Sequence, residues 1–256
     1  MTDPRAIADT LIEAERTGTP VVPFTRAYPF LDAATAYKAQ RLFVEHRLQA
    51  GESLVGAKLG LTSQVKRDAL GIDQPVYGRL TSGMLVPPGE PIPLDQLIHP
   101  RAEPEIAFLI GEVIEGPVTA AGVLAATEAV VAAVEVMDSR YSDRFRLPDS
   151  VADNAGAARF VLGSRPRRPG DLEDLRLVGC VFRSRGEVVG TAAGGAVMGD
   201  PAAAVAWLIN TLAGKGEQLP AGSVVLSGGL TVSVPLGHGA SVSAEFDGLG
   251  SIEVHS

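Results

Sequence analysis

The sequence lacks the features typical of proteins from an oxidising compartment, of membrane proteins and of proteins that bind nucleic acids. Cys180 is the only cysteine among 256 residues, so no disulfide can form within the chain. No apolar run reaches the roughly 18 residues of a transmembrane helix, and no cationic segment followed by an apolar one opens the chain. The net charge of -8 provides no basic stripe to neutralise phosphates. We therefore expect a cytoplasmic protein with no membrane and no nucleic-acid partner.

Several common catalytic motifs are also missing. No G-x-S-x-G surrounds a serine, and neither a P-loop lysine nor a G-x-G-x-x-G after a first strand is present. None of the four histidines, His46, His99, His238 and His255, stands in a metal-ligand spacing. These absences argue against a nucleophile-elbow hydrolase and against nucleotide binding.

The distribution of helical and strand patterns predicts an α+β fold. Residues 1–80 form a mostly helical N-terminal region that carries one strand, with helices at 4–16, at 32–49 after the N-cap Asp32, and at 63–70. Prolines and a glycine at residues 87–93 indicate a loop and a soft boundary in this part of the chain, and we assign residues 81–256 to a β-rich core.

Two further helices are expected within that β-rich core. An alanine-rich helix covers 119–130 and leads into the strand carrying Glu135, and Asp200-Pro201 starts a helix that stops near Gly214. Residues 223–253 read as strands separated by glycine turns. Helices gathered around an antiparallel or mixed sheet complete the α+β interpretation.

Three carboxylates are the clearest sign of chemistry. Glu103 and Glu105 are two residues apart in a strand-like run, so their side chains point to the same face. Glu135 lies in another apolar β-rich run, where a charge needs compensation. Convergent carboxylates repel one another, and a hard divalent cation removes that repulsion. The alternative is that these are solvated glutamates of an edge strand.

Other residues allow both a functional and a structural interpretation. Lys58 lies in a glycine-flanked apolar strand, where lost solvation would lower its pKa and suit it to proton transfer, unless its ammonium reaches the surface. Arg140 follows the Glu135 strand and could bind a substrate carboxylate or pair with Asp138. Residues 150–156 form a polar turn of small residues that could line a pocket or be an Asx-capped loop.

Six ordered blocks carry a resemblance to a known family. They are residues 56–63, 74–78, 98–108, 134–141, 151–154 and 227–229. Together they resemble the hydratase and decarboxylase branch of the fumarylacetoacetate hydrolase superfamily, from about residue 27 to the C-terminus. The resemblance implies a mixed β-sheet roll, like the C-terminal domain of fumarylacetoacetase, with peripheral helices and a helical N-terminal region.

The resemblance implies a lyase of aromatic meta-cleavage catabolism. Within this branch, 2-oxo-3-hexenedioate (4-oxalocrotonate) decarboxylases compete with 2-keto-4-pentenoate hydratases. Val76 stands where the hydratases usually carry an aspartate, and the stretches 138–141, 221–222 and 248–251 also look more like the decarboxylases. We favour the decarboxylase. A hydratase, a diverged enzyme acting on a related oxo acid, and a non-catalytic partner subunit are the alternatives.

The resemblance also assigns roles to residues and implies a cofactor. Glu103, Glu105 and Glu135 would hold Mg²⁺ or Mn²⁺, and Lys58 would be the proton donor or relay. The residues expected to contact a 2-oxo acid substrate are Ser139, Asp153, Leu59 and Ser63, with Arg140, Arg144 or Arg146 gripping its second carboxylate. Arg144 and Arg146 flank Phe145 in a segment that is one residue shorter than the family pattern and lacks its lysine. A homo-oligomer and a complex with a related hydratase are the expected assemblies.

Overall fold

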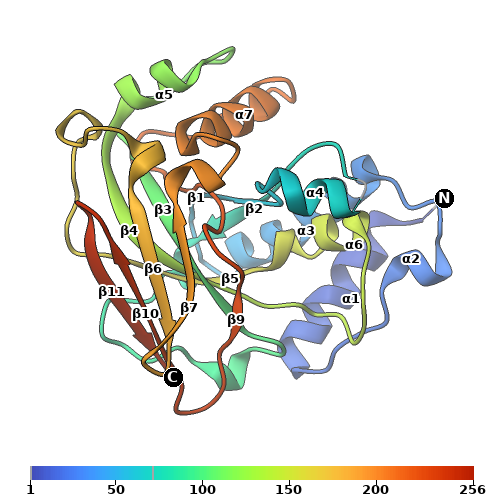
Figure 1. Ribbon diagram of the computed structural model, residues 1–256. Helices are drawn as coiled ribbons and strands as arrows, with labels where there is room; N and C mark the ends of the chain where they lie inside the picture. Colours follow the sequence, from blue (N-terminus) through green and yellow to red (C-terminus); the bar gives the residue numbers. More distant parts are fainter. Residues whose placement is uncertain (1, 71) are drawn as a thin grey trace.

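Two β-sheets with helices around them make up the computed structural model, which describes residues 2–70 and 72–256 (Figure 1). The α-helices are α1 (Pro4–Thr17), α2 (Phe24–Ala27), α3 (Ala33–Gln49), α4 (Gln64–Leu70), α5 (Ala120–Ala126), α6 (Leu147–Ala152) and α7 (Pro201–Ala213). The strands are β1 (Leu54–Gly60), β2 (Val76–Thr81), β3 (Arg101–Ile110), β4 (Thr127–Met137), β5 (Ala157–Leu162), β6 (Gly179–Ser184), β7 (Glu187–Ala193), β8 (Val224–Leu226), β9 (Val234–Pro235), β10 (Ser241–Phe246) and β11 (Gly250–His255).

Local sequence signals begin three of the helices. Asp3 caps α1 by accepting a hydrogen bond from the Arg5 N–H at 2.9 Å, and Asp32 caps α3 by accepting one from the Thr35 N–H at 2.7 Å. Asp200 caps α7 in the same way. Each aspartate satisfies an N–H that the first turn leaves without a helical partner, so the caps determine where these helices begin. The helices expected at these three places are confirmed.

The larger sheet is mixed and carries the residues of interest on one face. Its strand order is β2-β1-β8-β3-β4-β5, with β9 paired to β3. β1 and β8 run parallel, and the other neighbours are antiparallel. Because side chains alternate along a strand, Ile106 and Phe108 enter the main apolar core while Glu103 and Glu105 occupy the opposite face of β3.

A second sheet covers the apolar face of the first. Its order is β11-β10-β6-β7, and side chains such as Phe182 and Val242 share one buried cluster with Ile106 and Phe108. Helices α5 and α7 pack against each other, and the N-terminal helices α1 and α3 lie with α6 on the other side of the molecule (Figure 1). This arrangement confirms the α+β fold with a mixed sheet and peripheral helices.

One predicted helix is too long. The helix expected over 119–130 ends at Ala126, and Thr127 already starts β4. Thr127 pairs with Ile110 and Ala129 pairs with Leu109 of β3, so pairing between strands overrides the helix propensity of the alanine-rich run.

The boundary expected near residue 80 falls within one sheet. β1 and β2, which precede it, pair into the same sheet as β3, β4 and β5, which follow it. The N-terminal region therefore consists of helices and of two strands, β1 and β2, that belong to the larger sheet. Among the described residues, no helix combines the length and the apolar character needed to cross a membrane.

Candidate metal centre

Strand register brings the three predicted glutamates together. Glu103 of β3 pairs directly with Glu135 of β4, and Glu105 lies two residues further on the same face. One ligand oxygen from each carboxylate lies within 4.8 Å of the other two. Glu105 and Glu135 are fully buried and Glu103 is 8% exposed, so they are not solvated edge-strand residues.

The donor set fits a hard cation. Glu105 accepts a hydrogen bond from the Gly228 N–H through Oε2 at 2.6 Å, while its Oε1 and the Oε1 of Glu135 are buried without a hydrogen-bond partner in the described chain. Gly229 lies so close to the Glu103 carboxylate that an added Cβ would overlap it. Buried carboxylate oxygens without donors suit a divalent ion that takes oxygen ligands.

Lys58 completes the cluster from β1. Its Nζ lies 2.9 Å from Glu135 Oε2 in an ion pair between two buried side chains. The Lys58 ammonium also donates a hydrogen bond to the Ala155 carbonyl oxygen at 3.1 Å. Three carboxylates and one ammonium carry a net charge of −2 when ionised, which a single divalent cation would neutralise.

The cluster shifts the pKa of its own members. Burial, and then repulsion from Glu135 and Glu103, raises the pKa of Glu105 well above its usual value. Burial likewise raises the pKa of Glu135 to about 7, although Lys58 opposes this. For Lys58 the expected decrease is wrong: burial lowers its pKa, but Glu135, Glu105 and Glu103 outweigh burial and raise it.

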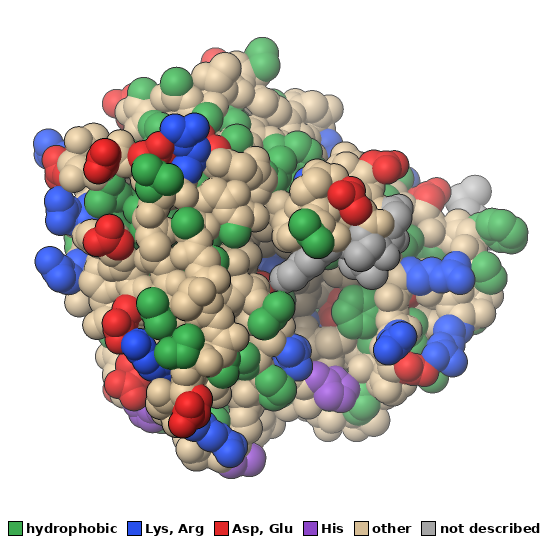
Figure 2. All heavy atoms as spheres, in the orientation of Figure 1, with side chains coloured by type: hydrophobic (Ala, Val, Ile, Leu, Met, Phe, Trp, Pro, Cys, Tyr) green, Lys and Arg blue, Asp and Glu red, His purple; other side chains and the backbone are tan. Residues whose placement is uncertain are grey.

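The cluster opens onto a cavity of about 330 Å³. Lys58 and Glu103 form part of its polar wall, and Leu61, Val76, Met137 and Phe145 form part of its apolar wall. Figure 2 shows the surface hollowed between the β-rich body and the helices of the N-terminal region. A buried lysine and convergent carboxylates at such a cavity are the features of a candidate active site.

The chain matches the family domain described as fumarylacetoacetate (FAA) hydrolase C-terminal over residues 53–255. The chain belongs to the fumarylacetoacetate hydrolase family. It is 41% identical over 249 residues to a 4-oxalocrotonate decarboxylase of Pseudomonas sp. (strain CF600), covering 96% of this chain and 94% of that protein. It is 39% identical to a 2-keto-4-pentenoate hydratase of Paraburkholderia xenovorans, covering 96% and 91%.

A solved structure of this family has nearly the same fold. It is the 4-oxalocrotonate decarboxylase from Pseudomonas putida G7 complexed with magnesium and adipate. The TM-score is 0.94 at 37% identity, covering 98% of this chain and 96% of that chain. The resemblance to the decarboxylase and hydratase branch is thereby confirmed over nearly the whole length.

Arg140 is not placed to bind a substrate in this member of the fumarylacetoacetate hydrolase family. Its guanidinium is fully buried, bonded to Asp153 Oδ1 at 3.1 Å and Glu15 Oε1 at 2.8 Å, and lies over the Phe43 ring. The structural alternative therefore holds, but the partners are Asp153 and Glu15 instead of the Asp138 carboxylate. Asp153 also faces the cavity, and burial raises its pKa to about 7 although Arg140 opposes this.

Of three other residues that we expected to contact the substrate, one lines the cavity. Ser139 lines the cavity. The Leu59 side chain instead enters the main apolar core, because it lies on the opposite face of β1 from Lys58. Ser63 precedes α4 and is not among the described residues that line the cavity.

The two arginines of the shortened segment lie outside the main cavity. Arg144 is exposed and absent from the described cavity wall, while Arg146, also exposed, borders a neighbouring cavity. Phe145 between them lines both cavities. The segment therefore contributes an aromatic ring to the main cavity.

Arg101 is a cavity residue that the sequence interpretation missed. Its Nε donates to Ser233 Oγ at 2.9 Å and its Nη2 to the Ser233 carbonyl at 2.5 Å. Alternation along β3 would have found it, because Arg101 precedes Glu103 by two residues and shares its face.

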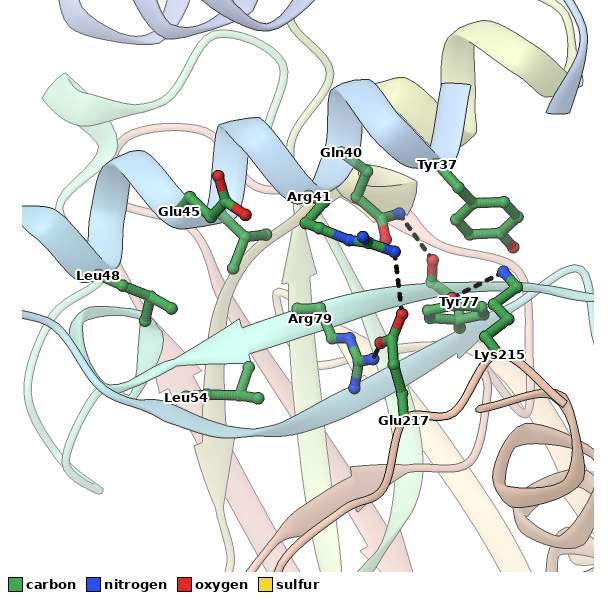
Figure 3. Close-up of a pocket in the computed structure, with 11 residues that line it drawn as sticks. Tyr37, Gln40, Arg41, Glu45, Leu48, Leu54, Tyr77, Arg79, Lys215 and Glu217 are labelled. Carbon is green, nitrogen blue, oxygen red and sulfur yellow. Dashed lines mark hydrogen bonds and ion pairs between the residues drawn. The ribbon is translucent and has the colours of Figure 1, made fainter. Parts of the chain in front are cut away.

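A separate cavity of about 390 Å³ lies between α3 and the β1–β2 pair (Figure 3). Lys215 donates to the Tyr77 hydroxyl at 2.9 Å, and Glu217 forms ion pairs with Arg41 and Arg79. No predicted site residue is among the described residues that line this cavity.

Proposed function

We propose that this protein is a divalent-metal-dependent decarboxylase of 2-oxo-3-hexenedioate (4-oxalocrotonate) in aromatic meta-cleavage catabolism. The products are 2-hydroxypenta-2,4-dienoate and CO₂. The observation that carries the proposal is the buried Lys58 beside three convergent glutamates at a cavity. The full-length similarity to proteins named 4-oxalocrotonate decarboxylase supports the choice of substrate.

Glu103, Glu105 and Glu135 would hold the metal, which we propose is Mg²⁺. A divalent cation bound there would act as a Lewis acid toward the 1-carboxylate and 2-oxo oxygens of the substrate. The solved relative that holds magnesium also holds adipate, a six-carbon dicarboxylate like the proposed substrate.

Lys58 would supply the proton that the reaction consumes. When the C5–C6 bond breaks, its electrons move through the C3–C4 double bond to the 2-oxo oxygen as CO₂ leaves. The Lys58 Nζ then donates a proton to that oxygen, which gives the 2-hydroxy-diene product. The surrounding carboxylates raise the pKa of Lys58, so its side chain carries the proton before the substrate reacts.

Arg101 is the arginine that we place near the distal carboxylate. It lines the cavity and lies two residues, or about 7 Å, from Glu103 along β3. An extended six-carbon dicarboxylate spans a similar distance. We place Arg101 there ahead of Arg144 and Arg146, which were expected to grip this carboxylate, because neither of the two is among the described residues that line the main cavity.

The hydratase is the second candidate, since several relatives carry that name. Hydration needs a positioned water, and an aspartate in place of Val76 would be suited to hold it. Val76 is apolar and lines the cavity, which favours the decarboxylase.

The deciding experiment measures CO₂ release from 2-oxo-3-hexenedioate by purified protein with Mg²⁺, with Mn²⁺ and after EDTA. Release that stops with EDTA and returns with metal is the expected result. Turnover of 2-hydroxypenta-2,4-dienoate without CO₂ release would select the hydratase. Absence of both activities and of metal binding would favour a non-catalytic partner subunit.

The assembly of the chain is a further part of the proposal. We propose a homo-oligomer that can also associate with a related hydratase. Light scattering after size-exclusion chromatography, with and without such a hydratase, measures both, and a monomeric mass at micromolar concentration would contradict self-association.

A further inference from the structure

We infer that Asn154 is a positioning residue that aims the ammonium of Lys58. The inference rests on the proposed function, in which Lys58 transfers a proton. It concerns the short turn η3 (Asn154–Gly156), which follows α6 and precedes β5. This turn lies against β2, beside the strand that carries Lys58.

The Ala155 carbonyl oxygen accepts a hydrogen bond from the Lys58 ammonium. Lys58 contacts Glu135 in an ion pair of 2.9 Å, and it donates a hydrogen bond of 3.1 Å to the Ala155 carbonyl oxygen. Because a hydrogen bond requires donor and acceptor to be aligned, the Ala155 carbonyl fixes one direction in which the ammonium points. Lys58 also lines the cavity, so the direction of its ammonium determines where it can donate a proton.

The turn that presents this carbonyl has an unusual backbone. Asn154, Ala155 and Gly156 have φ values of 53°, 52° and 73°, all in the left-handed region. Residues other than glycine adopt this conformation rarely, and asparagine does so more readily than alanine. Three consecutive left-handed residues need support from their surroundings to persist.

The Asn154 side chain provides that support. It is fully buried, accepts a hydrogen bond from the Arg79 N–H at 2.7 Å and donates one to the Arg79 carbonyl at 2.9 Å. β2 ends the strand order of its sheet, so this amide pairs with the backbone at the sheet edge as another strand would. Arg79 is labelled on β2 in Figure 3.

Gly78 allows the turn to come this close. It pairs with Lys58 in the β1–β2 register, and an added Cβ would overlap the Asn154 carbonyl oxygen. From the other side, the Asp138 N–H donates to the Gly156 carbonyl at 2.9 Å. The turn is thus held between β2 and the end of β4, with the Ala155 carbonyl directed at Lys58.

The first test is Asn154→Ala, with Asn210→Ala as a matched control. The side chain of Asn210 likewise accepts a hydrogen bond from the Val118 N–H at 2.7 Å and donates one to the Val118 carbonyl at 2.9 Å. Asn210 is exposed on α7, and Val118 lies in the loop before α5. We expect Asn154→Ala to lower kcat by about tenfold to a hundredfold, with KM and metal affinity changed by less than about threefold. The control should stay within about twofold of the wild type.

A double variant separates positioning from general damage. If Asn154 acts through Lys58, Asn154→Ala should change the residual kcat of Lys58→Met by less than about twofold. Should Asn154→Ala fail to fold, Gly78→Ala displaces the same turn while leaving both side chains in place, and the same loss of kcat is expected.

Three outcomes would overturn the inference. The first is a wild-type kcat in a folded Asn154→Ala or Gly78→Ala variant. The second is a loss of metal affinity in Asn154→Ala that is as large as its loss of kcat. The third is that Asn154→Ala lowers the residual kcat of Lys58→Met by the same factor as it lowers that of the wild type. A Lys58→Met variant with full activity would instead contradict the proposed function itself.

Discussion

Replacing Glu105 by glutamine should change stability and metal binding in opposite directions. Glu105 is fully buried among two other carboxylates, and only one of its oxygens has a hydrogen-bond donor in the described chain. Two unit charges 4.8 Å apart repel by about 3.5 kcal/mol at an effective dielectric constant of about 20. Glutamine removes this repulsion with almost no change of shape, so the metal-free Glu105→Gln variant should be more stable than the wild type at alkaline pH.

The same substitution should weaken metal binding strongly. In the wild type, three carboxylates and Lys58 would balance a divalent cation, whereas the variant leaves one buried positive charge uncompensated. An uncompensated buried charge costs about 3–5 kcal/mol, which corresponds to about 2 to 3.5 orders of magnitude in Kd. Activity should fall with metal occupancy.

Calorimetry measures both effects. Thermal unfolding in EDTA gives the stability of the metal-free protein, and isothermal titration with Mg²⁺ gives the affinity. Glu128→Gln is the matched control, since Glu128 lies on β4 but is exposed and outside the cluster. Wild-type Mg²⁺ affinity in Glu105→Gln, or a metal-free melting temperature below that of the wild type at alkaline pH, would refute the reasoning.

Three further predictions follow from the same geometry. Lys58→Met should lower kcat by about 10²- to 10⁴-fold, and near-normal steady-state turnover would contradict its role. Because the pKa of Glu135 is raised to about 7 from 4.5 in the metal-free protein, its stabilising contribution is complete below pH 4.5 and lost as pH rises through 7. In EDTA, the free energy of unfolding of the wild type relative to Glu135→Gln should therefore fall as pH rises through this window, and a difference that stays constant with pH would contradict the raised pKa of Glu135. Arg101→Ala should raise the inhibition constant of adipate by more than about tenfold, with that of oxalate unchanged, and equal effects on both would remove Arg101 from the distal subsite.

Local patterns predicted much of the fold and part of the site. The aspartate caps of α1, α3 and α7 depend on neighbouring residues only, and the shared face of Glu103 and Glu105 follows from strand alternation. The resemblance implied that Glu135 joins them at a metal, and the register of β3 and β4 is what brings it opposite Glu103.

What the sequence did not predict depends on distant partners. Arg140 follows Asp138 along the chain, but its guanidinium is bonded to Glu15, which is 125 residues away in sequence. The raised pKa of Lys58 likewise depends on carboxylates of β3 and β4, so the local apolar strand alone gave the wrong direction. The start of β4 at Thr127 was missed because β3 selects the strand over the local helix preference.

The pairing of Glu103 with Glu135 makes the proposed metal centre a property of sheet register. A slip of one residue between β3 and β4 would turn Glu135 toward the apolar core and bring Val134 or Val136 opposite Glu103. Chains with misregistered strands would then lack the three-carboxylate set even if they were compact and rich in β-structure. Metal retention by a refolded preparation would therefore report the fraction of molecules whose central sheet is correctly assembled.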